Sequence, residues 1–243
     1  MTGELERQIV ELTAVHKGLC NVSEQEGRTI ITGPLPFEAE SDGLPLIVES
    51  FDIELSVPPE YPEIFPRVKE TGGKIEPTYE HLYADKELCL GVPIEERRIF
   101  AAQPSLLGFV NGLVIPYLYS YCYWKQHGKY PFDDQLHGAA GIVRHYVDTL
   151  NLNDEIAALS VICFLYEHGY RGHHACPCGS GQIVRHCHGD ALRELNRYHT
   201  RHTLKTDFEA LLTACKDRLL AADQARPIAL LRQIQRILKS LGH

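Results

Sequence analysis

The sequence has few basic residues for its length. It holds 24 Lys and Arg against 32 Asp and Glu, which gives a formal net charge of -8 over 243 residues. General nucleic-acid binding needs a clustered basic surface for phosphate contacts, so this composition argues against that class. The first six residues also lack the basic start and apolar run of a signal peptide, and we therefore expect no export.

One long segment, residues 99–124, contains no Asp, Glu, Lys or Arg. It is long enough to cross a bilayer, for which roughly 20 apolar residues suffice. Asn111, Pro116, Ser120 and four tyrosines make it a poor hydrocarbon span. The favoured prediction is a pair of buried helices packed on a sheet, with a membrane span as the alternative.

Cysteine is the residue type that the chain does have in quantity, with eight copies. Without an export signal, eight cysteines indicate a reducing compartment such as the cytoplasm, where they serve metals, catalysis or packing and form no structural disulfides.

With 44% hydrophobic residues the chain can bury a real core. One larger domain with an appendage is expected, rather than two equal domains.

Hydrophobic periodicity predicts an α+β fold for residues 1–150. The alternation in residues 46–57 is typical of a half-buried antiparallel strand, with apolar Phe51, Ile53 and Leu55 on one face. A helix should precede the strands and helices should follow them, the first of these divided or kinked by Pro116. The full prediction is a helix at 3–16, strands at 29–32, 46–57 and 67–70, and helices at 106–124 and 137–150.

Residues 151–243 form a second predicted region, which is helical. Asn153 is placed to cap a helix at 154–167, and the Thr206 to Glu209 spacing is typical of a capping box. The apolar residues after Asp190 recur at helical spacing. That pattern suits packing within the chain or the seam of a homodimer.

A strong metal signal lies between these helices, in the spacing Cys-x-Cys-x8-Cys-His. Its members are Cys176, Cys178, Cys187 and His188. Three thiolates and one imidazole suit tetrahedral Zn²⁺, and the Gly-Ser-Gly between the pairs lets a short loop fold back. We therefore predict a structural zinc with these four ligands.

Three alternatives to this ligand set stay open. The cysteines could be ordinary buried thiols, or the ion could be catalytic, although catalytic sites usually keep three protein ligands and an open position. One of His173, His174 and His186 could also replace His188.

The run Cys-Pro-Cys-Gly-Ser-Gly that ends in Cys-His resembles the SEC-C motif, here within residues 173–190. That resemblance implies a structural zinc used to dock on a partner protein.

The second chemical signal is Cys89, in the run Glu-Leu-Cys-Leu-Gly. It follows His81 by eight residues and comes after the proline-rich residues 57–66. A thiol beside a His, in a region of fixed backbone, could be a positioned nucleophile. The alternative is a buried strand end, because free cysteine behaves as a small hydrophobe.

Residues 51–90 also resemble the core of ubiquitin-conjugating enzymes. The resemblance rests on Phe-Asp-Ile-Glu-Leu at 51–55, on Tyr61-Pro62 with Pro66, and on His81 with Leu-Cys-Leu at 88–90. It implies a UBC-like domain followed by a small helical zinc-binding module. It also implies that Cys89 carries a ubiquitin-like protein as a thioester.

This chain departs from the family pattern at the residue that steadies the oxyanion. Eukaryotic members have His-Pro-Asn, whereas this chain has His-Leu-Tyr at 81–83. His81 could shape the loop or take part in the chemistry, and Tyr83 offers a hydroxyl. Asn111 and His137 are the other candidate donors, so the predicted catalytic set is Cys89, His81, Tyr83 and His137.

The departure points to the prokaryotic branch of the family, whose bacterial members include antiphage defence proteins. We expect a transferase in which Cys89 accepts the C-terminus of a ubiquitin-like or other protein from an activating enzyme and passes it to an amine on a target. The alternative is an inactive UBC-like scaffold with a zinc-binding interaction module. A thiol hydrolase is a third option, but it needs a base oriented by an acid or amide, and no signature of one is present.

Overall fold

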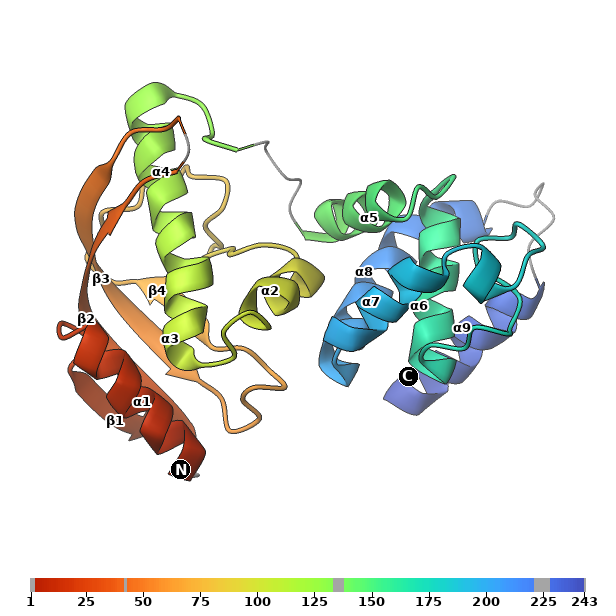
Figure 1. Cartoon of the computed structure of the whole chain (residues 1–243), viewed down its shortest axis with the longest axis horizontal. Coiled ribbons are helices and arrows are strands. Elements are labelled where there is room, and N and C mark those ends of the chain that lie inside the picture. The colour runs from red at the N-terminus through yellow and green to blue at the C-terminus, as the bar shows by residue number, and fades with distance from the viewer. Residues whose placement is uncertain (1–2, 42, 133–137, 221–227, 243) are drawn as a thin grey trace. The chain divides into compact units, whose positions relative to one another are not determined.

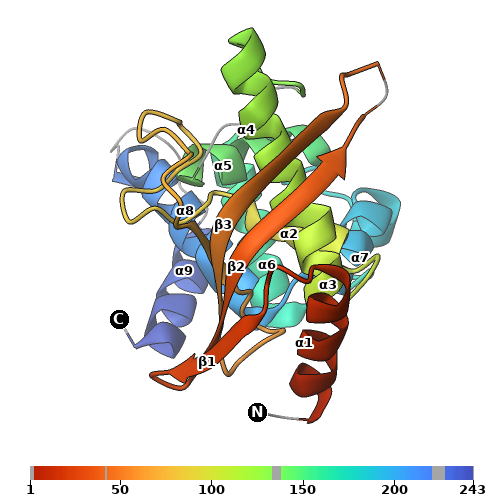
Figure 2. The same cartoon turned by 90° about the vertical axis from the view of Figure 1, so that its left-hand side faces the viewer.

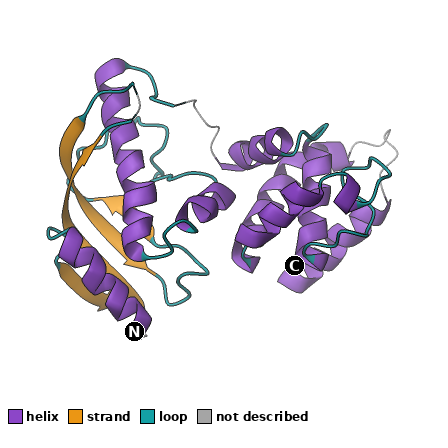
Figure 3. Cartoon of the chain, viewed as in Figure 1, coloured by secondary structure: helices purple, strands orange, loops and turns teal. Residues whose placement is uncertain are grey.

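The computed structural model describes residues 3–41, 43–132, 138–220 and 228–242. The chain mixes helices with a four-stranded antiparallel sheet and divides into two compact units (Figure 1). The first unit comprises Met1–Gly91 and Arg98–Asp134, and the second comprises Val92–Arg97 and Gln135–His243. Among the described residues every strand belongs to the first unit, as Figure 3 shows by colour.

The first unit opens with a helix and a meander sheet. Helix α1 spans Gly3–Val15, and the strands are β1 (Asn21–Gln25), β2 (Arg28–Ala39), β3 (Ile47–Val57) and β4 (Arg67–Glu70). The strand order is β1-β2-β3-β4 and every pairing is antiparallel. The long β2–β3 pair is the centre of the sheet in Figure 2. The predicted first helix and the predicted strands at 46–57 and 67–70 are confirmed to within a residue or two.

The register explains which faces of the strands are buried. Ile31 pairs with Leu55, and Leu55 pairs with Val68 on its other side. All three side chains are almost fully buried and belong to one apolar cluster. The alternation in β3 therefore sets the side of the sheet that packs against the helices, because side chains two residues apart share a face.

Two sequence-based predictions for the sheet were wrong. Strand β2 does not end at Gly33 and Pro34 but continues to Ala39. Beyond Thr32 no strand among the described residues pairs with it on the β1 side, so it is an edge there, and an edge tolerates proline. Strand β1 was missed because all of its residues are exposed and it lacks an apolar alternation.

Helix α2 (Pro93–Phe100) follows the sheet in the chain and lies mostly in the second unit, and the helical run after it covers the sheet. That run comprises α3 (Leu106–Phe109), the π-helix η1 (Val110–Val114) and α4 (Ile115–His127). Pro116 has no N–H to donate to the helix. The one-turn π segment just before it accommodates the missing hydrogen bond, so the helix widens locally where the sequence predicted a kink or a division. Helix α4 contacts β2 and β3 and supplies buried aromatic side chains to the core. No helix in the part of the chain that the structure describes is long and apolar enough to cross a membrane.

The second unit is helical. Its elements are α5 (Gly138–Thr149), α6 (Glu155–His168), the 3-10 turn η2 (Val184–His186), α7 (Gly189–Tyr198), α8 (Arg201–Leu220) and α9 (Ile228–Leu241). Helix α8 packs on α5 and α6, and α6 also packs on α9. Buried residues of these helices form a second apolar cluster, so each unit has a core of its own.

Two predicted helix starts in this unit were wrong. Asp154, not Asn153, caps α6, because its Oδ1 accepts the Ala157 N–H at 2.9 Å. Thr206 lies inside α8 and bonds back to the His202 carbonyl. The α8 cap is Thr200, whose hydroxyl accepts the Thr203 N–H at 3.1 Å.

Candidate functional site

The metal motif lies in a loop that folds back on itself between α6 and α7. The Cys176 N–H donates to the Gln182 carbonyl at 2.7 Å, and Ala175 pairs with Ile183 in an isolated bridge. The reversal occurs at Gly179 and Gly181, both with positive φ, a region that glycine enters without steric cost. The turn η2 follows and places Cys187 beside the first two cysteines.

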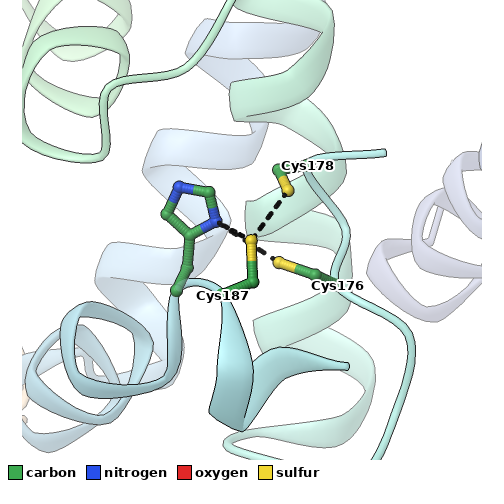
Figure 4. Close-up of side chains that lie close together, drawn as sticks. Cys176, Cys178 and Cys187 are labelled. Atoms are coloured by element: carbon green, nitrogen blue, oxygen red, sulfur yellow. Dashed lines mark hydrogen bonds between the residues drawn. The ribbon is translucent and has the colours of Figure 1, made fainter. Parts of the chain in front are cut away.

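Four candidate ligand atoms converge in this loop. The Sγ atoms of Cys176, Cys178 and Cys187 and a ring nitrogen of His188 all lie within 4.8 Å of one another. Cys178 Sγ lies 3.5 Å from Cys187 Sγ, and His188 Nδ1 lies 3.2 Å from Cys187 Sγ and 3.4 Å from Cys176 Sγ. Figure 4 shows the three sulfurs pointing into the same small space.

These separations fit a tetrahedral metal ion. Zn–S bonds of about 2.3 Å at tetrahedral angles place two sulfurs roughly 3.8 Å apart. The ligand atoms of the four residues, all within 4.8 Å of one another, need only small movements to reach that spacing. The donor set could therefore hold one metal ion, with all four tetrahedral positions taken by the protein.

A backbone carbonyl orients the histidine ligand. His188 Nε2 lies 2.8 Å from the Leu150 carbonyl oxygen, at the end of α5. Nε2 must carry the proton to donate there, which leaves the Nδ1 lone pair directed at the sulfurs. Outer-sphere bonds of this type fix the tautomer of metal-bound histidines. The contact also ties the metal loop to α5, a link that the sequence could not indicate because a main-chain oxygen carries no residue signal.

The thiols of the loop differ in their electrostatic setting. Burial raises the pKa of Cys176 to about 12. Burial is also the largest single effect on Cys178 and raises its pKa, but hydrogen bonds from Ser180, Cys176 and Cys187 together lower that pKa to about 6. The Ser180 hydroxyl also lies 3.3 Å from Cys187 Sγ. Ser180 therefore also contributes hydrogen bonds to the cysteine sulfurs, a role that the sequence analysis did not give it.

The other histidines near the motif are not in the cluster. His173, His174 and His186 lie outside the four-residue group. His174 instead stacks its ring against His168 and Phe164 of α6, with ring centroids 5.3 and 5.9 Å away. Among the candidate ligands considered from sequence, His188 is the one that the fold brings to the three sulfurs.

Cys89 lies in the first unit, in the loop between β4 and α2. Its N–H donates to the His81 carbonyl at 2.9 Å, just after a bridge between Leu82 and Leu88. The Tyr117 hydroxyl of α4 donates to the same carbonyl at 2.9 Å. Burial, followed by neighbouring groups that include Cys89, raises the pKa of Tyr117 well above its usual range, so this hydroxyl stays protonated at neutral pH.

The residue is buried, which differs from the accessible thiol expected from sequence. Cys89 is 6% exposed. It counts among the buried apolar residues of the core, as Cys122, Cys163 and Cys215 do.

The other predicted catalytic residues have diverse settings. His81 packs its half-buried ring against Tyr79 and Tyr130, with centroids 5.1 and 5.0 Å away. Tyr83 is 49% exposed, and its N–H donates to the Glu87 carbonyl. The Asn111 side-chain oxygen lies 2.8 Å from Nε2 of His16, the residue just after α1. His137 lies outside the described residues.

A buried polar cluster in the second unit was not foreseen from sequence. The Tyr146 hydroxyl of α5 donates to Asp207 Oδ2 of α8 and lies 2.7 Å from His199 Nε2. Tyr146 and Asp207 are fully buried, and Asp207 Oδ1 has no hydrogen-bond partner within the described ranges. Burial raises the pKa of Asp207 to about 7 and lowers that of His199 to about 3, with His145 adding to the second effect. The contacts among these three groups join α5 to α8.

Comparison with known proteins adds no family to this description: no protein-family model, no curated protein and no solved structure matches the chain. Function must therefore be argued from the two cysteine sites themselves.

Proposed function

We propose that the chain is an acyl carrier of the ubiquitin-conjugating type, with Cys89 as the residue that carries the acyl group. The order of its elements supports this: a helix, an antiparallel meander, the Cys89 loop and then a long helix over the sheet. That is the order expected from the family resemblance of residues 51–90.

The observation that carries the proposal is the way the Cys89 loop is fixed. The Cys89 N–H and the Tyr117 hydroxyl both donate to the His81 carbonyl. A fixed loop beside a protonated hydroxyl is the kind of setting in which a positioned nucleophile acts.

The proposed reaction has two acyl transfers. The Cys89 thiolate attacks the carbonyl carbon of a protein C-terminus that is bound as a thioester to an activating enzyme. The new S–C bond forms as the enzyme's thiolate leaves with the electron pair of the old one. An amine on the target then attacks the same carbon, a C–N bond forms, the amine loses its proton and the Cys89 thiolate is released.

For the second unit we propose a structural Zn²⁺ held by Cys176, Cys178, Cys187 and His188. Three thiolates select a soft or borderline ion, and four protein ligands leave no open position for a substrate. In line with the SEC-C resemblance, this unit would hold the target or the carrier protein. The proposed setting is the bacterial cytoplasm, in a conjugation or antiphage defence pathway, where thiols stay reduced.

The low exposure of Cys89 favours a second candidate function. At 6% exposed, the side chain offers little surface to an incoming carbonyl. In this second account the first unit is an inactive UBC-like scaffold and the zinc unit is its protein-interaction module.

A mass measurement separates the two functions. The chain is incubated with ATP and with the activating enzyme and carrier protein encoded beside it. The carrier function predicts an adduct that thiols cleave, and a Cys89→Ser variant should form an ester that thiols leave intact and hydroxylamine cleaves. Cys20→Ser, at an exposed cysteine of the same unit, is the matched control and should form the normal adduct.

The scaffold function predicts a different pair of results. No adduct forms with the carrier. In addition, iodoacetamide labels Cys20 in the folded protein but labels Cys89 only after the protein is unfolded, because a buried thiol that never opens is inert.

A further inference from the structure

A shallow groove opens on the second unit, lined by residues other than the four candidate metal ligands. Its volume is about 560 Å³. The polar residues that line it come from the end of α6, the start of α8 and the C-terminal half of α9: Tyr166, Glu167, His168, Arg201, Arg236 and Ser240. Nothing in the Cys89 chemistry or in the metal centre uses these residues.

The carboxylate in the lining is already neutralised. Arg236 Nε lies 2.7 Å from Glu167 Oε1, and Arg236 Nη2 lies 2.9 Å from Oε2, a two-pronged pair. Gln233 donates to the same carboxylate at 3.2 Å. These bonds, that of Arg236 first, lower the pKa of Glu167. With its charge balanced, Glu167 does little to repel an anion that enters the groove.

The other guanidinium of the groove is not balanced in this way. Arg201 stacks over the Tyr166 ring, 4.6 Å from its centroid. In the described parts of the chain no carboxylate pairs with it and no side-chain hydrogen bond occupies it. Stacking holds the face of the guanidinium and leaves its N–H edge for a planar anion.

The position of Arg201 in the helix adds to the positive potential. It is the first residue of the 20-residue helix α8, and the first turn of α8 contains no acidic residue. A cation at a helix N-terminus is unfavourable because that end already has a partial positive charge. Two sources of positive potential therefore meet at the mouth of the groove, a combination that an anion stabilises.

The basic residues of the second unit also favour the binding of an anion near the groove. Exposed Arg232 and Lys239 lie two turns apart on one side of α9. The second unit holds 14 Lys and Arg against 12 Asp and Glu, whereas the first unit holds 10 against 20. The groove thus lies in the less acidic unit and beside a basic helix face.

We propose that this groove is a docking site for an acidic peptide segment of a protein partner, with an Asp or Glu carboxylate bound to Arg201. A carboxylate matches one guanidinium edge, with two parallel N–H···O bonds. A phosphate site would bring together several donors, including backbone N–H groups. The neighbouring Ser240 hydroxyl is unsuited to that part because it donates to the Ile237 carbonyl at 2.7 Å.

The test uses the full chain as purified and a fluorescein-labelled hexaglutamate peptide, followed by fluorescence anisotropy at low salt. Arg201→Gln should weaken binding about tenfold, since a charge-assisted pair contributes roughly one such factor or more. Arg201→Lys keeps the charge but loses the fork, so it should fall between the two. The matched control is Arg197→Gln on α7, which makes the same change in charge at another exposed arginine and should stay within about twofold.

Four results would overturn the proposal. They are no binding of hexaglutamate, equal losses in the Arg201 and Arg197 variants, equal binding of a hexaglutamine peptide, and displacement of the peptide by an equimolar amount of inorganic phosphate. Because Arg201 is exposed, the variants should melt at the temperature of the parent chain, and that measurement separates lost binding from lost structure.

Discussion

The two units hold their candidate functional cysteines in different ways, as a cluster of ligand atoms in the second unit and as a single thiol in the first. In the second unit three cysteines and a histidine, spread over thirteen residues of sequence, bring their ligand atoms within 4.8 Å of one another. In the first unit Cys89 is a single thiol, and its setting is made by His81 and by Tyr117 of α4. The difference teaches that a cluster of candidate metal ligands can be encoded locally, whereas the setting of a single thiol depends on residues that only the fold brings near.

The largest predicted effect on the stability of either unit is that of losing the metal. Cys187→Ser removes one thiolate and should destabilise the second unit by several kcal/mol. Structural zinc supplies roughly 10 kcal/mol or more in small zinc fingers, and the loss should be smaller here because this unit also has an apolar core. Thermal unfolding followed by calorimetry should show one transition moving down while the transition of the first unit stays in place.

Cys20→Ser is the control for this change, because Cys20 is exposed and lies in the other unit. It should leave both transitions unchanged. A joint shift of both transitions in the Cys187 variant would contradict the separation of the two cores.

Leu55→Ala, in the core of the first unit, should instead destabilise that unit and leave the second unchanged. Leu55 is fully buried between β2 and β4, so its truncation should cost about 2 to 5 kcal/mol through lost burial and a residual cavity. Urea unfolding should show the loss in the first unit alone. Val48→Ala, at a residue that is 66% exposed on the neighbouring stretch of β3, should change stability by less than about 0.5 kcal/mol. Equal effects of the two substitutions would show that β3 does not have the buried face described above.

Sequence reasoning did best where one local rule decides the outcome. The alternation in residues 46–57 predicted β3, and the Cys and His spacing predicted which four side chains converge. It did worse where neighbours decide: β2 runs on through Pro34 because its other edge is open there. Asp154 takes the capping role from Asn153 although both residue types suit it.

Sequence reasoning could not reach the contacts made across the fold. The bond from His188 to the Leu150 carbonyl joins residues 38 positions apart, and the Tyr146–Asp207 bond spans 61 positions. Neither pairing has a pattern along the chain. The burial of Cys89 is likewise set by what packs over its loop and not by the Leu-Cys-Leu run itself.

Substituting two histidines that lie close together in sequence tests which residue is the fourth ligand. His188→Ala should lower metal affinity by about 100-fold or more, because it removes a ligand and the Leu150 contact together. Competition with a chromophoric chelator measures that affinity. His186→Ala is the matched control, since His186 is exposed and outside the cluster, and it should have little effect. The reverse order of effects would reassign the ligand.

A further predicted effect is a pH dependence of stability confined to the second unit. The pKa of Asp207 is about 7 in the folded chain and near 4 in an unfolded one, so only the folded state keeps this proton between those values. The contribution of Asp207 is fully present below about pH 4 and is lost as pH rises to about 7, at about 1 kcal/mol per pH unit.

His199 gives the opposite slope. Its pKa of about 3 lies below the unfolded value near 6.5, so its contribution is present above about pH 6.5 and is lost as pH falls towards 3. The two slopes cancel between about pH 4 and 6.5 in the parent chain. Asp207→Asn should remove one of them, so that stability rises with pH across that window. Denaturant titrations at several pH values check this, and parallel curves for parent and variant would show that Asp207 is ionised in the folded state.

The most direct test of the account is the zinc content of the purified full chain, measured by elemental analysis before and after a single substitution. The account predicts about one zinc per chain, lost in Cys187→Ser and retained in Cys89→Ser, because only the first residue belongs to the four-ligand cluster. A folded parent chain without zinc, or zinc that survives Cys187→Ser and disappears with Cys89→Ser, would contradict it.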